Sequence, residues 1–209
     1  MELSGRAAIV TGAGIGVGRA TALALAGAGC DVIVDYSRSK DAAEAVATTS
    51  FIPHDDLEAV TADTWSSIMG VNLVGPFQMA RAAATALKAN GGGHIVNISS
   101  VAGVYGTGSS IPYCASKAGL NNLTVTLARV LAPEVQVNAV CPGFIDGSWL
   151  QEGYGDAFDA IRQAAIDKSL LDAVSTPDDI KDAIFGFLLG SKLTTGELLV
   201  VDGGRGKAL

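Results

Sequence analysis

The sequence predicts an α/β fold in which a doubly wound parallel sheet carries helices on both faces. Short apolar runs of strand length alternate along the 209 residues with longer stretches of helical character. The first apolar run leads directly into a cluster of glycines that opens a helix, and no internal repeat interrupts the alternation. Strands that alternate with helices pair in parallel, because each connection crosses back over the sheet. We expect a single domain over residues 1–209.

The N-terminal half begins with a strand, a helix and a second strand. The strands are AAIVT at 7–11 and DVIVD at 31–35, and the helix between them covers about 16–28. A further helix is predicted at about 40–47. Helical character returns near TADTW and continues to about Lys88, with an interruption at Gly75-Pro76.

The C-terminal half continues the alternation. Its predicted elements are a strand at 94–99, a long helix at 113–131 that ends before Pro133, a strand at 135–140, a helix that begins at Thr176 and a strand at 197–201. Thr176 is a hydroxyl N-cap followed by proline and two aspartates, which suit the positive end of a helix. Residues 143–170 form an insertion with a helix expected inside it, and we treat it as the substrate-loop region.

Composition and charge exclude several classes of partner. The net charge of −7 and the pI of about 4.7 oppose nucleic acid and anionic membrane surfaces, since both require a basic footprint. The longest apolar stretch, ATALALAGAG, is too short to span a membrane. With 49% hydrophobic and 17% charged residues, part of the surface is expected to contact another subunit, which predicts a homo-oligomer, a dimer or tetramer.

The three cysteines and two histidines of the sequence are candidates for metal binding or redox chemistry. Cys30, Cys114 and Cys141 match neither a metal knuckle nor a redox pair, and they fit a reducing cytoplasm. Neither His54 nor His94 has acids at ligand spacing, so no metal site is expected.

The glycine cluster T11-G-A-G-I-G-V-G18 lies between a predicted strand and a predicted helix. Glycines at such a junction let the backbone approach a pyrophosphate, which rests on the unpaired N–H groups of the helix N-terminus. An ordinary flexible turn is the alternative. The position between strand and helix favours nucleotide binding.

Four motifs in order resemble the short-chain dehydrogenase/reductase family. They are TGxxxGxG at 11–18, VNLVG with Asn72, NISS with Ser100, and YCASK with Tyr113 and Lys117. The resemblance covers residues 5–204 apart from one gap, and it implies a Rossmann-type domain similar to 3-oxoacyl-acyl-carrier-protein reductases or glucose dehydrogenases. Such enzymes are NAD(P)-dependent oxidoreductases that interconvert a carbonyl and a secondary alcohol.

The resemblance assigns catalytic roles to four residues. Tyr113 and Lys117 share a helix face, being four residues apart, and a nearby ammonium favours the phenolate of a tyrosine whose ordinary pKa is about 10. Tyr113 is then the general acid/base, and Lys117 also holds the nicotinamide ribose. Ser100 donates a hydrogen bond to the substrate oxygen, and Asn72 positions a water that links Lys117 to solvent.

The resemblance also implies which residues hold the cofactor. Besides Tyr113 and Lys117, they are Gly12, Gly14, Ile15, Gly16, Val17, Gly18, Tyr36, Ser37, Arg38, Pro142, Gly143 and Ile145. The NAD-selecting acid of the family is replaced by Tyr36, and Ser37 and Arg38 follow, so NADP is favoured over NAD. The alternative is that Arg38 is a loop charge and Asp35 binds the ribose.

The substrate-loop region departs from the family in one respect. Gly147 stands where a threonine is common, and Ser148 is a possible substitute for its hydroxyl. Trp149, Tyr154 and Phe158 line a hydrophobic substrate pocket in one interpretation and pack a lid on the core in the other.

The gap in the resemblance follows Ala47. There the family continues with a strand, a helix and a second strand, which together need roughly 35 residues, but the chain proceeds directly to TTSFIPHDDL. The second of these strands belongs in mid-sheet beside the first strand of the chain. A sheet without it leaves unpaired backbone edges, so we hypothesise that the native polypeptide contains residues here that this sequence lacks.

Two other classes of function compete with the reductase. A non-catalytic dinucleotide-binding sensor or scaffold with a degenerate fold is favoured by the gap and opposed by the intact Ser100, Tyr113 and Lys117. A methyltransferase on a similar sheet also uses a glycine-rich loop, but it has no need of these three residues.

Overall fold

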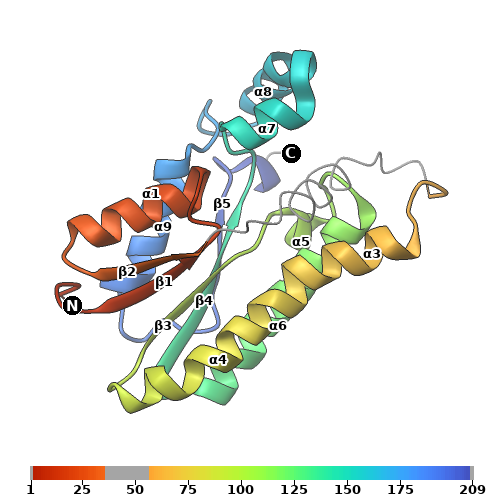
Figure 1. Cartoon of the computed structure of the whole chain (residues 1–209). Helices are drawn as coiled ribbons and strands as arrows, with labels where there is room; N and C mark the ends of the chain where they lie inside the picture. The colour runs from red at the N-terminus through yellow and green to blue at the C-terminus, as the bar shows by residue number, and fades with distance from the viewer. Residues whose placement is uncertain (1, 36–56, 208–209) are drawn as a thin grey trace. The chain divides into compact units, whose positions relative to one another are not determined.

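The computed structural model describes residues 2–35 and 57–207, which form two compact units. Unit 1 comprises Met1–Lys40, Phe144–Ser191 and Val201–Leu209, and unit 2 comprises Asp41–Gly143 and Lys192–Val200. Both units combine strands with helices, and parallel strand pairs occur in each of the two sheets (Figure 1). The predicted α/β class is therefore confirmed. The helix predicted at 40–47 lies outside the described residues.

Unit 1 begins with the predicted strand–helix–strand arrangement. Strands β1 (Ala7–Thr11) and β2 (Asp31–Asp35) have the predicted bounds and pair in parallel, with Ala7 opposite Asp31. Helix α1 (Gly16–Gly27) connects them and packs on both strands and on α9 (Pro177–Leu189).

Helix α9 begins with the predicted cap. The Thr176 Oγ1 accepts a hydrogen bond from the Asp179 N–H at 3.3 Å, and the Asp179 carboxylate accepts one from the Thr176 N–H at 2.7 Å. This reciprocal capping box satisfies two backbone donors that the helix cannot pair internally.

The substrate-loop region contains more helix than the sequence indicates. Two helices, α7 (Ser148–Tyr154) and α8 (Phe158–Asp167), flank a 3₁₀ turn, η2 (Gly155–Ala157). Phe158 is 6% exposed, and its ring centroid lies 5.8 Å from that of Phe144, so this aromatic packs inside unit 1. Tyr154 is half-buried. A second 3₁₀ turn, η3 (Arg205–Lys207), ends the described part of this unit.

Unit 2 contains the second sheet and the longest helix. Its elements are α3 (Ala62–Met69), the π-helix η1 (Gly70–Val74), α4 (Gly75–Ala89), β3 (Gly93–Ile98), α5 (Ala102–Tyr105), α6 (Ile111–Leu131), β4 (Val135–Pro142) and β5 (Leu198–Val201), whose last residue falls in unit 1. The strand order is β3-β4-β5, and β3 pairs with β4 in parallel.

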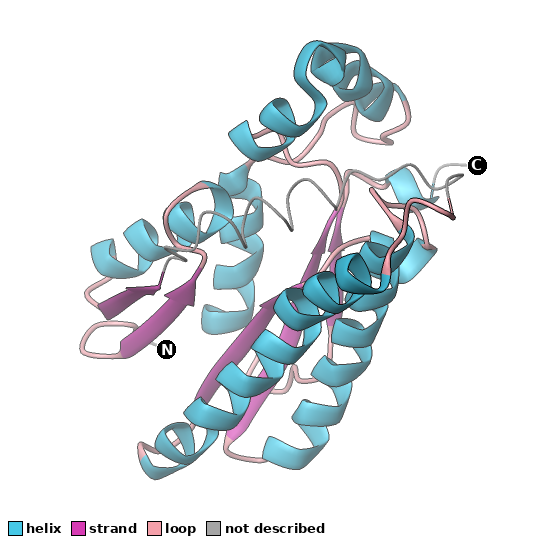
Figure 2. Cartoon of the chain, turned by 45° about the vertical axis from the view of Figure 1, so that its right-hand side comes forward, coloured by secondary structure: helices cyan, strands magenta, loops and turns pink. Residues whose placement is uncertain are grey.

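The core of unit 2 lies between its helices and strands. Helices α4 and α6 pack against β3 and β4 (Figures 1 and 2). The buried cluster contains Ala128, Leu131, Val135 and Val137, with Ala84, Leu87, Ile95 and Leu127 packed around it. Burial of these side chains holds α6 against the sheet, because each fully buried aliphatic side chain contributes about 1.5–3 kcal/mol.

Several element boundaries differ from the prediction, two of them for local reasons. The interruption expected at Gly75-Pro76 is a π-helical turn, η1, after which Pro76 occupies the first turn of α4, where its missing N–H is tolerated. Helix α6 starts at Ile111 instead of Tyr113, since the Ser110 hydroxyl caps it. The strands at 94–99 and 197–201 are observed at Gly93–Ile98 and Leu198–Val201.

The strands form two separate sheets within the described residues. β1 pairs only with β2, so one edge of β1 has no strand partner there. Ile9 is 53% and Ile33 61% exposed, although strands of a doubly wound sheet are usually covered on both faces. This is the arrangement expected if a strand beside β1 is missing. The backbone at residues 43–53, where extra residues would be inserted, lies outside the described residues.

The missing-strand hypothesis predicts the mass of the native protein. Protein purified from the cells that make it should exceed the 21.1 kDa of this sequence by several kilodaltons, because the two strands and their helix need roughly 35 residues. Intact-mass spectrometry measures this directly. A native mass of 21.1 kDa would show that the chain is truly shortened.

Candidate active site

Helix α6 carries Tyr113 in its first turn and Lys117 one turn later. The Ser110 side chain accepts a hydrogen bond from the Tyr113 N–H at 3.3 Å, and Pro112 lies in the first turn, two residues after the cap. A hydroxyl cap followed by proline is a strong local signal for a helix start. The cap therefore fixes the backbone of Tyr113 where the helix begins.

Lys117 is held between the end of β3 and the ring of Tyr113. Its Nζ donates a hydrogen bond to the Ile98 carbonyl at 3.0 Å and lies 5.7 Å from the centroid of the Tyr113 ring. Burial lowers the pKa of Lys117 from 10.5 to about 8, against a smaller opposing effect of Cys141. An ammonium placed here favours negative charge on the neighbouring phenol.

Ser100 follows β3 and lies in a segment tied to the end of β4. Its Oγ accepts a hydrogen bond from the Ala102 N–H at 3.1 Å and keeps its own proton for donation. The Val101 N–H donates to the Pro142 carbonyl at 3.0 Å. Ser100 and Pro142 are both buried, so this part of unit 2 is firmly packed.

Glycines allow the Ser100 segment to lie directly on α6. A Cβ at Gly103 would lie 2.4 Å from the carbonyl carbon of Lys117, which is backbone and cannot move aside. A Cβ at Gly108 would lie 2.7 Å from the Ala102 Cβ and 3.3 Å from a ring carbon of Tyr113. Helix α5 can approach α6 this closely only because both positions lack a side chain.

Asn72 reaches the same helix from the π-helix η1. Its Nδ2 donates a hydrogen bond to Ser116 Oγ at 3.1 Å, and Ser116 lies between Tyr113 and Lys117 on α6. The four residues predicted to be catalytic, Asn72, Ser100, Tyr113 and Lys117, thus all belong to unit 2. Asn72, Tyr113 and Lys117 are linked along α6, and Ser100 lies two residues after Ile98, to which Lys117 is bonded.

The glycine-rich loop belongs to unit 1. Gly12 and Gly16 have φ angles of +65° and +52°, which side chains adopt with strain. A Cβ at Gly18 would lie 2.3 Å from the Gly12 carbonyl oxygen, so the start of α1 packs directly on the loop. The N-cap residue Ile15 provides no side-chain cap, and the first turn has no acid. The N–H groups there suit an anion such as a pyrophosphate.

Only some of the other residues predicted to bind the cofactor belong to the described ranges. Tyr36, Ser37 and Arg38 lie outside the described residues. Asp35, the alternative ribose ligand, has an exposed side chain, and its carbonyl accepts a hydrogen bond from the Ala13 N–H at 3.1 Å. Ile145 forms an isolated parallel bridge with Ser175 in unit 1. Pro142 is the last residue of β4, and Gly143 is the last residue of the first segment of unit 2.

The described parts of the chain contain the three cysteines and other residues of metal-ligating types. All three cysteines are free thiols, and burial raises the pKa of Cys114 and of Cys141. No group of three metal-ligating side chains occurs among residues 2–35 and 57–207, and no helix in these ranges is long and apolar enough to cross a membrane.

Three contributors to the site were missed from the sequence. Ser116 accepts a hydrogen bond from Asn72, and Ser99 donates its Oγ proton to the Lys117 carbonyl at 3.2 Å. Gly103 lets α5 lie against the backbone of α6. The position of Ser116 inside the YCASK motif could have drawn attention to it. Ser99 likewise lies inside the NISS motif, whereas Gly103 carries no local signal, because its contact comes from a distant part of the chain.

Two family models match the chain. The model described as short chain dehydrogenase matches residues 6–51, and the model described as Enoyl-(Acyl carrier protein) reductase matches residues 45–205. The change from one model to the other falls at 45–51, directly beside the gap predicted after Ala47.

Curated relatives carry reductase and dehydrogenase names. The chain is 39% identical over 169 residues to a Streptomyces violaceoruber protein that carries the name of ketoacyl reductase 2 of the granaticin polyketide synthase, covering 81% of this chain and 67% of the relative. It is 35% identical to the Bacillus subtilis short-chain dehydrogenase/reductase homolog YusR, covering 63% of this chain and 97% of the relative. It spans only 57% of the Thermotoga maritima 3-oxoacyl-acyl-carrier-protein reductase FabG, with 34% identity over 68% of this chain.

Solved structures share the fold. A gluconate 5-dehydrogenase from Burkholderia cenocepacia, in complex with NADP and tartrate, matches with a TM-score of 0.82 and 25% identity, covering 100% of this chain and 98% of that one. The aldohexose dehydrogenase of Thermoplasma acidophilum matches with a TM-score of 0.85 at 24% identity, covering 100% and 96% of the two chains, and it supports the fold alone.

The lowered pKa of Lys117 predicts how stability responds to pH. The folded chain releases this proton near pH 8 and the unfolded chain near 10.5, so the penalty for burying the charge is present below pH 8 and is relieved between these values. Thermal unfolding of the wild type and of Lys117→Met should be compared at pH 7 and pH 10. The melting temperature of the variant minus that of the wild type should be lower at pH 10. A difference that is the same at both pH values would contradict the buried-charge interpretation.

Proposed function

Because the chain belongs to the short-chain dehydrogenase/reductase family, we propose that it transfers a hydride reversibly between NADP(H) and a carbonyl or secondary-alcohol substrate, with Tyr113 as general acid/base. The observation that carries the proposal is the position of Lys117, whose ammonium is bonded to Ile98 and lies over the Tyr113 ring. This is the arrangement that proton transfer by a phenol requires near neutral pH.

The proposed catalytic residues have different tasks. Tyr113 gives its proton to the substrate oxygen during reduction and takes it back during oxidation. Lys117 favours the phenolate form by its charge, and its ammonium is also the group proposed to hold the nicotinamide ribose. Ser100 donates its free hydroxyl proton to the substrate oxygen, and Asn72 positions a water that connects Lys117 to solvent. The cofactor supplies or accepts the hydride.

The glycine loop supports a dinucleotide as the cofactor. Gly18 lies against Gly12 where no side chain fits, and the uncapped start of α1 offers N–H groups to the pyrophosphate. We assign Gly12, Gly14, Ile15, Gly16, Val17 and Gly18 to this contact. Pro142, Gly143 and Ile145 are assigned to the nicotinamide, as the family resemblance implies.

NADP is proposed over NAD because a positively charged residue, Arg38, follows β2 in the sequence. Arg38 and Ser37 supply a cation and a hydroxyl for a 2′-phosphate, with Tyr36 beside them, whereas an NAD site needs an acid that accepts from the ribose hydroxyls. The neighbouring gluconate 5-dehydrogenase was solved with NADP. The exposed side chain of Asp35 keeps NAD as the alternative.

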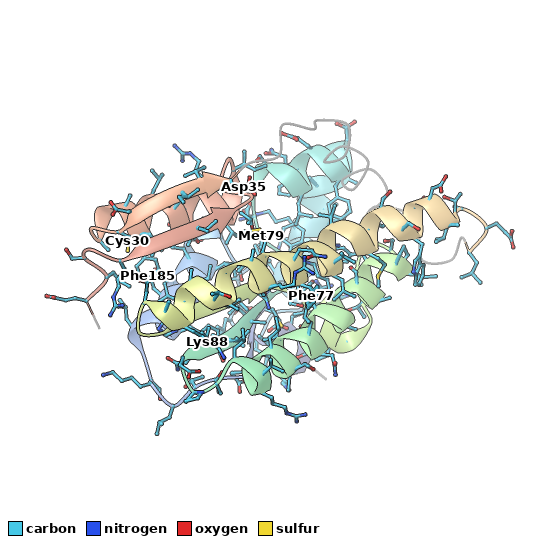
Figure 3. The ribbon with its side chains drawn as sticks, turned by 60° about the horizontal axis from the view of Figure 1, so that its bottom comes forward. Cys30, Asp35, Phe77, Met79, Lys88 and Phe185 are labelled. Atoms are coloured by element: carbon cyan, nitrogen blue, oxygen red, sulfur yellow. The ribbon has the colours of Figure 1, made fainter. Side chains whose placement is uncertain are left out.

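We also propose a cytoplasmic homo-oligomer, a tetramer or dimer, acting on a small molecule. Apolar side chains remain exposed along α3, η1 and α4, and two of them on α4, Phe77 and Met79, are labelled in Figure 3. The set comprises Trp65, Val71, Val74, Phe77 and Met79. Exposed apolar area of this kind is typical of subunit contacts. Three free thiols fit a reducing compartment.

A non-catalytic dinucleotide-binding protein is the second candidate. The observation in its favour is that, among the described residues, β1 lacks a strand partner on one edge and Ile9 and Ile33 are exposed. A chain that truly lacks the strand beside β1 would hold its cofactor weakly. Turnover by the wild-type protein separates the two candidates.

Replacement of Tyr113 by Phe tests the acid/base assignment. The variant should lose roughly 100-fold or more in turnover, the typical contribution of a positioned acid/base, while its dissociation constant for NADPH changes little. Oxidation of NADPH at 340 nm with 3-oxoacyl thioesters and aldohexoses, together with fluorescence titration of NADPH, measures both. Undiminished turnover would refute the role of Tyr113.

Replacement of Arg38 by Asp tests cofactor choice. Loss of the cation should raise the Michaelis constant for NADPH at least about tenfold more than that for NADH, because only NADPH carries the 2′-phosphate. Steady-state kinetics with both cofactors give the two constants. Equal effects would show that Arg38 does not read the phosphate.

A further inference from the structure

Ser116 has no part in the function proposed above, yet it is a fully enclosed polar residue near Tyr113. Its exposed fraction is 0%, and its hydroxyl makes two hydrogen bonds. Oγ donates to the Tyr113 carbonyl at 2.7 Å and accepts from Asn72 Nδ2 at 3.1 Å. The hydroxyl therefore connects two residues to which the proposed reaction gives roles.

The directions of these two bonds follow from chemistry. A carbonyl oxygen can only accept, so the single proton of the Ser116 hydroxyl is committed to Tyr113. Toward Asn72 the hydroxyl can then only accept. The Asn72 side chain must present its NH₂ group to Ser116, and its Oδ1 must point elsewhere. Ser116 thus determines which end of the amide faces which way.

Packing next to Asn72 limits other movements of this segment. A Cβ at Gly119 would lie 3.0 Å from Leu73 Cδ2, so the π-helix η1 is seated against α6 at a glycine. This contact limits the movement of η1 relative to α6, and the terminal amide of Asn72 can still rotate about its own bond. The hydrogen bond to Ser116 removes that freedom.

We propose that Ser116 is a positioning residue that orients the amide of Asn72 for proton transfer. The inference rests on the proposed function, because it gives the amide orientation a consequence for turnover. Without the Ser116 hydroxyl, the Nδ2 of Asn72 has lost its acceptor and the amide group is free to rotate by about 180°. The Oδ1 of Asn72 then no longer occupies one position relative to Lys117 and Tyr113.

The chain provides a matched control on the same helix. Asn97 Nδ2 donates to Thr124 Oγ1 at 2.9 Å, and Thr124 Oγ1 donates to the Leu120 carbonyl at 2.8 Å. This is the same asparagine–hydroxyl–carbonyl arrangement, and Thr124 is also 0% exposed. Asn97 and Thr124 have no assigned catalytic or binding role.

The first experiment compares Ser116→Ala with Thr124→Val. Each leaves an asparagine amide without its acceptor, half-buried at Asn72 and buried at Asn97, so both should lower the melting temperature. Only Ser116→Ala should reduce kcat, by roughly ten- to a hundredfold, with the KM for NADPH within about twofold of wild type. Unchanged kcat in Ser116→Ala, or an equal fall in both variants, would overturn the proposal.

The second experiment asks whether Ser116 acts through Asn72. In a cycle of Asn72→Ala, Ser116→Ala and the double variant, the double variant should have the kcat of Asn72→Ala alone. A kcat of the double variant that is lowered by the product of the two single-variant factors would overturn the proposal.

Failure of the proposed function gives a different result. If the wild type shows no turnover with any NADPH–carbonyl pair, the reductase assignment falls. The same four proteins are then unfolded in urea, where positive coupling between the two sites supports the orienting bond and additive losses overturn it.

Discussion

The candidate site depends on the way Lys117 attaches α6 to the end of β3. Its side chain donates to the Ile98 carbonyl, and its own carbonyl accepts from the Ser99 hydroxyl, so both ends of one residue bind the same short segment. These bonds fix the register of α6 against the strand. The positions of Tyr113 and Ser116 on the helix, and of Ser100 after the strand, follow from that register.

The same attachment brings a conflict between stability and chemistry. Lys117 is useful when charged, but its surroundings lower its pKa to about 8, so a substantial share of its ammonium is lost in mildly alkaline solution. Gly103 intensifies the burial, since α5 lies directly on the Lys117 backbone. A more open site would keep the charge at lower cost and would hold Tyr113 less firmly. The packing thus holds Lys117 and Tyr113 firmly in place at the expense of the charged form of Lys117.

Sequence reasoning predicted the elements whose signals are local. The apolar runs of β1 and β2 gave the observed bounds, and the Thr176 cap marked the start of α9, because each depends on neighbouring residues. The spacing of Tyr113 and Lys117 predicts that they share a helix, and both lie on α6, while their catalytic roles stay a prediction from the family resemblance. The π-helix was read as an interruption, since the glycines and proline that surround it also suit a break.

What could not be predicted depends on distant contacts. Nothing near Gly103 or Ser99 indicates that Lys117 lies against them, because that contact forms only when α6 packs on the sheet. For Phe158 the sequence left pocket lining and packing equally open, and only its contact with Phe144 shows that it packs. The gap in the family resemblance after Ala47 is visible in the sequence, but the arrangement of the described strands in two separate sheets required coordinates.

The π-helix also sets the angular phase between two helices that otherwise form one continuous rod. A π turn adds one residue to the helical repeat, and one residue corresponds to about 100° of rotation. The residues of α4 are therefore turned by about that angle from where an uninterrupted continuation of α3 would place them. Shortening Gly70–Val74 by one residue would rotate Phe77 and Met79 to another side of the rod, so the outer surface of α4 and the direction of Asn72 are specified by the same five residues.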